Sequence, residues 1–167
     1  RSLSRIKLIW TTMISREDLK KLLREFNEKG YSDPNSKYID NGKNGKVLKL
    51  NIGEYSYEDE YYGGEPYCGN ETIWEKGIDI FRCVYWGKVV DGVDFGSIYG
   101  FLREALSKGP DGELVHRGPT EYISENLKYT NEIVGDIYEF RQVERIYLNG
   151  TEVYTAYFIG GRINVRK

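Results

Sequence analysis

Two segments of the chain repeat apolar residues with the period of an amphipathic helix. In the first segment, Ser15 with an acidic residue three positions later is typical of a helix start, and Gly30 is typical of a helix end. The pattern predicts a helix over residues 15–29 whose apolar stripe packs against a core. The stripe consists of Leu19, Leu22, Leu23 and Phe26.

A second segment follows the same rules further along the chain. Ser97 is the expected N-cap, and Lys108-Gly109-Pro110 ends the helix. The polar positions mix Lys, Arg and Glu, which is usual for a solvated face. The apolar stripe consists of Ile98, Phe101, Leu102, Ala105 and Leu106.

Strand patterns occupy most of the remaining chain. Asn149-Gly150 lies between two alternating runs and predicts a two-residue type I′ hairpin turn. Lys76-Gly77 takes the corresponding place in the first half of the chain. Additional short strands are expected at residues 46–52 and 163–166.

The two halves of the chain also resemble each other. Residues 22–30 and 101–109 are similar, and ordered matches continue at offsets of 72 and 73 residues. We therefore predict an α+β fold, in which an internally duplicated helix-plus-three-strand unit forms a mostly antiparallel, twisted sheet with two helices packed on it. The expected single domain covers residues 13–167, with pseudo-repeats at about 15–90 and 95–163.

The predicted hairpin register places the two cysteines and Glu71 on particular faces of the sheet. It pairs Glu71 with Arg82 on one face and gives Cys83 to the opposite, core face as a small filler. Cys68 then lies diagonally from Cys83, with Cβ atoms about 7–8 Å apart. A disulfide needs about 3.5–4.5 Å, so two free thiols are expected.

Composition and charge exclude several classes of function. The 167 residues include 24 Lys and Arg against 26 Asp and Glu, which gives a net charge of −2 and argues against a nucleic-acid partner. No apolar run is long enough to span a membrane. One His and two Cys are too few for a four-ligand Cys/His zinc site, and no metal or cofactor is predicted.

The first residues are treated separately from the domain. Residues 1–12 precede the single methionine, Met13, and are expected to be an N-terminal extension or a cloning remnant. Their apolar centre is too short for a signal peptide, so a cytoplasmic location is expected.

Aromatic residues and one arginine are the candidate ligand-binding positions. Tyrosine offers an apolar face with a polar tip, so the run of tyrosines could line a pocket for a planar or sugar-like molecule, or simply tile a half-buried sheet. Arg117 follows His116 in a loop and could bind a carboxylate or phosphate, or anchor the loop to a backbone carbonyl or an acid. The candidates are Tyr55, Tyr57, Tyr61, Trp74, Tyr85 and Arg117.

A cluster of carboxylates gives a weaker candidate site. Its members could hold a divalent cation or act as acid and base, but solvated strand charges are the favoured explanation. No serine or cysteine nucleophile is placed by a motif near His116, the only histidine. The carboxylates are Glu54, Glu58, Asp59, Glu60 and Glu71.

An ordered set of short motifs extends over about residues 15–165. They are Gly53-Glu54-Tyr55-Ser56-Tyr57, Tyr61-Tyr62-Gly63-Gly64, Tyr85-Trp86-Gly87, Phe101-Leu102-Arg103-Glu104-Ala105-Leu106, Arg117-Gly118-Pro119 and Phe158-Ile159-Gly160-Gly161-Arg162-Ile163. In this set the chain resembles a prokaryotic family of small proteins known as a domain of unknown function, some members of which are fused to an N-terminal helix-turn-helix regulator domain. One predicted helix precedes the strands here, so the resemblance implies the sensing or oligomerising half of such a regulator.

Three functions therefore compete. The first is a non-enzymatic small-ligand-binding or sensor domain, which requires a deep aromatic pocket. The second is a protein-interaction or homodimerisation module, which requires a flat exposed aromatic patch. The third is a hydrolase-like enzyme that uses clustered carboxylates. The expected partners are a small molecule or a second copy of the chain, with neither nucleic acid nor membrane.

Overall fold

The computed structural model describes residues 13–112 and 116–164, so the predicted extension at residues 1–12 lies outside the described residues. Nine strands are present in this part of the chain. They are β1 (Ile39–Asp40), β2 (Gly45–Ile52), β3 (Tyr55–Gly63), β4 (Tyr67–Glu75), β5 (Ile78–Val89), β6 (Glu121–Ser124), β7 (Leu127–Asp136), β8 (Glu139–Leu148) and β9 (Thr151–Arg162). All neighbouring strands are antiparallel, in the order β1-β2-β3-β4-β5-β9-β8-β7-β6.

Both predicted helices are confirmed. Helix α1 (Arg16–Lys29) begins at Ser15, whose hydroxyl accepts a hydrogen bond from the Asp18 backbone N–H, and its predicted stripe is buried. Helix α2 (Phe95–Ser107) also buries the predicted stripe, but its N-cap is Asp94 rather than Ser97. The Asp94 carboxylate accepts from two backbone N–H groups of the first turn, which a single serine hydroxyl does less well.

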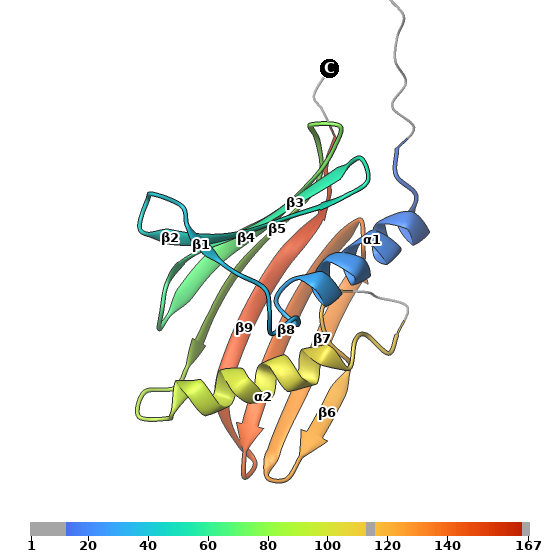
Figure 1. Ribbon diagram of the computed structural model, residues 1–167. Coiled ribbons are helices and arrows are strands. Elements are labelled where there is room, and N and C mark those ends of the chain that lie inside the picture. The colour runs from blue at the N-terminus through green and yellow to red at the C-terminus, as the bar shows by residue number, and fades with distance from the viewer. Residues whose placement is uncertain (1–12, 113–115, 165–167) are drawn as a thin grey trace, which may run out of the picture.

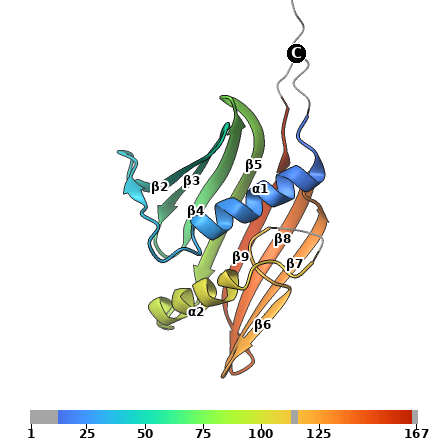
Figure 2. The ribbon, with the colours of Figure 1, turned by 45° about the vertical axis from the view of Figure 1, so that its right-hand side comes forward.

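The sheet is strongly curved, and both helices lie on its concave side (Figures 1 and 2). Strands β5 and β9 meet in the middle of the sheet and join the part that contains β1–β4 to the part that contains β6–β8. The apolar core lies between the concave face and the helices. None of the described helices is long and apolar enough to span a membrane.

The predicted fold class is wrong. The chain is a mostly β protein, with 51% of the described residues in strands and 18% in helices, rather than an α+β fold built from a duplicated helix-plus-three-strand unit. Strands of up to 12 residues pair into one continuous sheet, whereas two helices of 14 and 13 residues cover only part of one face. The division at residues 15–90 and 95–163 stays a prediction.

Both hairpin turns are confirmed, but their strand register differs from the predicted one. Lys76-Gly77 and Asn149-Gly150 all have positive φ, as a type I′ turn requires. Each hairpin then contains a bulge, which shifts the pairing by one residue beyond Ile73 and Ile146.

The bulge in the first hairpin changes which residues reach the core. Glu71 pairs with Cys83 instead of Arg82, so Glu71 points into the core. Cys68 pairs with Trp86 and is exposed, whereas Cys83 is buried. The two cysteines are free, as predicted, although they lie on opposite faces of the sheet.

Candidate functional site

A pocket of about 540 Å³ opens on the concave side of the sheet, between α2 and the loop that follows α1. The sheet contributes its floor from β3, β4, β5 and β9. Tyrosines dominate the wall, and one buried acid and one buried arginine lie among them, Asp59 and Arg117. The lining tyrosines are Tyr31, Tyr38, Tyr61, Tyr67, Tyr85 and Tyr99.

Asp59 is held by two of these tyrosines. The hydroxyls of Tyr38 and Tyr85 each donate to one carboxylate oxygen of Asp59, both at 2.5 Å. Burial, together with the neighbouring charge of Glu71, raises the pKa of Asp59 to about 6, although the two hydrogen bonds act in the opposite direction. The floor of the pocket therefore contains a carboxyl group that changes its charge near neutral pH.

Arg117 is fixed by an ion pair and by aromatic rings. Its Nε–H donates to Glu144 Oε1 at 2.9 Å, and its guanidinium lies 4.9 Å from the ring centre of Phe158 and 5.5 Å from that of Tyr31. Burial lowers the pKa of Arg117, but Glu144, Tyr154 and Glu71 together outweigh burial and raise it well above the ordinary value. Arg117 is thus a permanent cation that anchors its loop to an acid and also lines the pocket.

His116, next to Arg117, contacts the second buried glutamate. Its Nδ1 lies 2.5 Å from Gln142 Oε1, and its Nε2 lies 3.0 Å from Glu71 Oε2. The Gln142 oxygen accepts from Nδ1–H, and Nε2 shares a hydrogen bond with the Glu71 carboxyl group, so both ring nitrogens have a partner. Burial raises the pKa of Glu71, but the charge of His116 and their hydrogen bond outweigh it and hold that pKa below the ordinary value.

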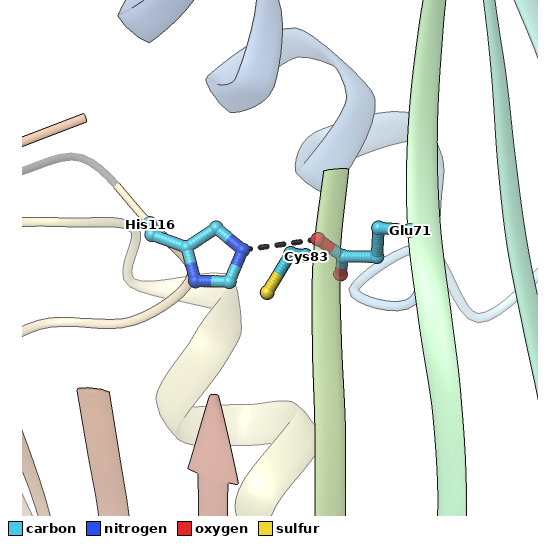
Figure 3. Close-up of side chains that lie close together, drawn as sticks. All are labelled: Glu71, Cys83 and His116. Carbon is cyan, nitrogen blue, oxygen red and sulfur yellow. Dashed lines mark hydrogen bonds and ion pairs between the residues drawn. The ribbon is translucent and has the colours of Figure 1, made fainter. Parts of the chain in front are cut away.

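The side chains of Glu71 and His116 also lie close to the thiol of Cys83, and the three residues are called the contact set below. One ligand atom from each side chain lies within 4.8 Å of the others, and all three residues are buried. Figure 3 shows the imidazole, the thiol and the carboxylate directed toward one another. Nitrogen, sulfur and oxygen ligands at this spacing are chemically able to hold a transition-metal ion.

Three of the six predicted ligand-binding residues line the pocket. They are Tyr61, Tyr85 and Arg117. Tyr57 instead stacks on Phe26 of α1, with ring centres 4.8 Å apart, and is buried in the core. Tyr55 donates to Glu75 at 3.3 Å, away from the pocket, and Trp74 follows buried Ile73 and so faces the outer side of β4.

The sequence reasoning missed the contributions of loops and of α2. Tyr31 and Tyr38 lie in the non-periodic segment after α1, where no pattern assigns them a direction. Tyr99 and Arg103 extend from α2 at positions outside its apolar stripe. A polar-tipped aromatic residue beside a helix stripe is the only sequence signal that marks Tyr99.

The predicted carboxylate cluster divides into two groups. Glu54 and Glu58 make exposed ion pairs with Lys76 and Lys49, and Glu60 accepts from Asn41, as expected for strand charges in solvent. Asp59 and Glu71 are strand partners on the buried face. The predicted ion pair of Glu71 with Arg82 is wrong, because Arg82 binds Asp79 instead.

Comparisons with curated proteins and with solved structures gave no match. The comparison with protein families matched residues 59–163, which include most of the sheet, α2 and the loop that contains His116 and Arg117. This match confirms the resemblance to a domain of unknown function. Because it covers more than half of the chain, the protein belongs to the family described as Domain of unknown function (DUF5680).

Proposed function

We propose that this protein is a small-molecule-binding domain whose ligand occupies the tyrosine-lined pocket. The observation that carries the proposal is the pocket itself, because about 540 Å³ lies within the range of small-ligand sites. Its walls combine apolar ring faces with a few convergent polar groups, which is the usual composition of such sites.

The polar groups indicate which ligand chemistry suits the pocket. Arg117 uses its Nε–H for Glu144, and among the described residues its terminal NH₂ groups have no side-chain hydrogen-bond partner. A guanidinium that presents its two terminal NH₂ groups matches a carboxylate or phosphate. Arg103 adds a second cation at the pocket wall. The proposed ligand is a flat organic molecule with one anionic group.

The sensor role rests on the family resemblance. If relatives carry this domain next to a helix-turn-helix domain, ligand binding here would regulate that neighbour. The enzyme alternative has less support. Glu71 and His116 do not line the pocket in the described structure, so of the buried acids only Asp59 could act on a bound molecule there. A sensor needs only selective binding.

The test is a calorimetric and thermal-shift screen with planar aromatic carboxylates, each measured beside its neutral carboxamide. At a ligand concentration about 100 times Kd, binding adds about 2.7 kcal/mol to the free energy of unfolding. We expect stabilisation by carboxylates and a weaker effect of the matched carboxamides. Equal effects of both members of each pair would contradict the role of the arginines.

Two tyrosine variants form a matched control for the screen. Tyr61→Ala removes a pocket wall, whereas Tyr55→Ala removes a tyrosine of the same strand outside the pocket. Binding should weaken in the first variant and persist in the second. Equal loss in both variants would contradict the assignment to this pocket.

Homodimerisation is the second candidate function, because one observation favours it. On the outer face, where β5 pairs with β9, four apolar side chains are 40–56% exposed. They are Val84, Trp86, Tyr157 and Ile159. An exposed apolar patch of this kind is typical of an association surface. No stabilisation in the screen, together with a molar mass that rises with protein concentration, would favour this alternative.

A further inference from the structure

The contact set of Glu71, Cys83 and His116 lies outside the pocket and has no role in the proposed ligand binding. Its members come from β4, β5 and the loop after α2 (Figure 3). Glu71 and Cys83 are direct strand partners, so the sheet fixes their separation. Each side chain is a common ligand of transition metals, and each is almost fully excluded from solvent.

Hydrogen bonds orient the histidine as in known metal sites. Gln142 Nε2 donates to Glu144 Oε1 at 3.2 Å, which turns Gln142 Oε1 toward His116. His116 donates from Nδ1 to that oxygen at 2.5 Å, so Nε2 is left to face Glu71 and Cys83. A histidine ligand typically binds the metal through one nitrogen while the other donates to a neighbouring acceptor.

From this geometry we propose that Glu71, Cys83 and His116 bind one Zn²⁺ ion. Zinc binding displaces two protons, the thiol proton of Cys83 and the proton that His116 Nε2 shares with Glu71. The metal-free set contains the Cys83 thiol and one proton shared between His116 and Glu71, with no net charge. The zinc-loaded set contains Zn²⁺, a carboxylate, a thiolate and a neutral imidazole, again with no net charge.

The placement of the three ligand atoms, within 4.8 Å of one another and shielded from solvent, supports the site, and a carboxylate with a thiolate compensates the two charges of the ion. A buried site tolerates an ion only where its charge is compensated. The mixed sulfur, nitrogen and oxygen ligands favour zinc over calcium or magnesium, which bind oxygen ligands. Three protein ligands give a tetrahedral ion one further position, which an exogenous ligand would take.

The test uses the full chain without an affinity tag, because His116 is then the single histidine. After treatment with a chelator, Zn²⁺ is titrated by calorimetry and Co²⁺ by absorption spectroscopy. We expect one metal ion per chain and, with Co²⁺, a thiolate-to-metal charge-transfer band. Absence of binding at one equivalent of either metal overturns the proposal.

The two cysteines provide the matched control. Cys68→Ala changes the exposed thiol and should keep the band, whereas Cys83→Ala should lose it. A band that disappears with Cys68→Ala or persists with Cys83→Ala overturns the site. If Cys83→Ala fails to fold, Cys68→Ala alone still decides, because the chain has only two cysteines.

Discussion

Two buried glutamates lie on the concave face, and one loop supplies a basic partner to each. Glu71 pairs with His116, and Glu144 pairs with Arg117. Gln142 joins the two pairs, because its amide oxygen accepts from His116 while its amide nitrogen donates to Glu144. The same backbone segment thus gives two buried carboxyl groups two different basic partners, an imidazole and a guanidinium.

The surroundings of the two glutamates differ in chemistry. The strand partners are Asp59 and Cys83 for Glu71, and Asn131 and Ala156 for Glu144. An acid and a thiol can exchange protons, whereas an amide and a methyl group cannot. The Glu144 side therefore has a fixed charge pattern, and the Glu71 side can change its protonation or bind a metal.

The largest effect is expected on the fixed side. Arg117→Met leaves the Glu144 carboxylate buried and without its cation, which should cost about 3–5 kcal/mol of the free energy of unfolding. Chemical denaturation measures this difference. Arg82→Met is the control, because it breaks an ion pair exposed to solvent and should cost about 1 kcal/mol or less.

A double variant tests the cause of that loss. Adding Glu144→Gln to Arg117→Met removes the unpaired charge and should restore part of the stability. No recovery, or a single-variant cost near that of Arg82→Met, would contradict the assignment of Arg117 as the partner that compensates Glu144.

The second effect concerns pH on the changeable side. Folding raises the pKa of Asp59 from 3.8 to about 6, so its proton is bound more tightly in the folded chain. The resulting stability is full below pH 3.8 and is lost as pH rises through about 6. The loss amounts to about 3 kcal/mol.

Asp59→Asn isolates this contribution, because an amide stays neutral as Asn131 does on the other side. The stability of Asp59→Asn relative to the natural chain should increase between pH 4 and pH 7, as measured by denaturation at several pH values. A difference that is constant across this range would show that Asp59 ionises normally.

Local patterns in the sequence predict the helices and the hairpin turns around these two glutamates. Both helix stripes follow from apolar spacing, because burial of one face decides helix packing. Both turns follow from dipeptides that tolerate positive φ. For Arg117 the sequence predicts a loop residue that binds an anion or anchors the loop to a backbone carbonyl or an acid, and it does not single out Glu144 as the partner.

The position of Glu71 could not be predicted in this way. Strand residues alternate between faces, so a single bulged residue reverses the pairing of everything beyond it. The bulge after Ile73 moves Glu71 from Arg82 to Cys83, and hence from solvent to the core. The pocket could not be predicted either, because Tyr31 and Tyr38 line it from a loop whose sequence has no periodicity.

The smallest effect on stability is expected at the strand partners of the two glutamates, Cys83 and Ala156, which differ by a single sulfur atom. Cys83→Ala gives the Glu71 side the methyl group that Ala156 already provides on the Glu144 side, where it is fully buried. The change removes one sulfur atom and its weak hydrogen bond to the Val84 carbonyl oxygen, so it should cost about 1 kcal/mol without metal. Cys68→Ala, on the exposed face, should stay within about 0.5 kcal/mol of the natural chain. Denaturation in the presence of a chelator measures both values. A cost of several kcal/mol for Cys83→Ala under these conditions would mean that the thiol holds the metal-free core together, and the two sides would then differ in packing rather than in chemistry.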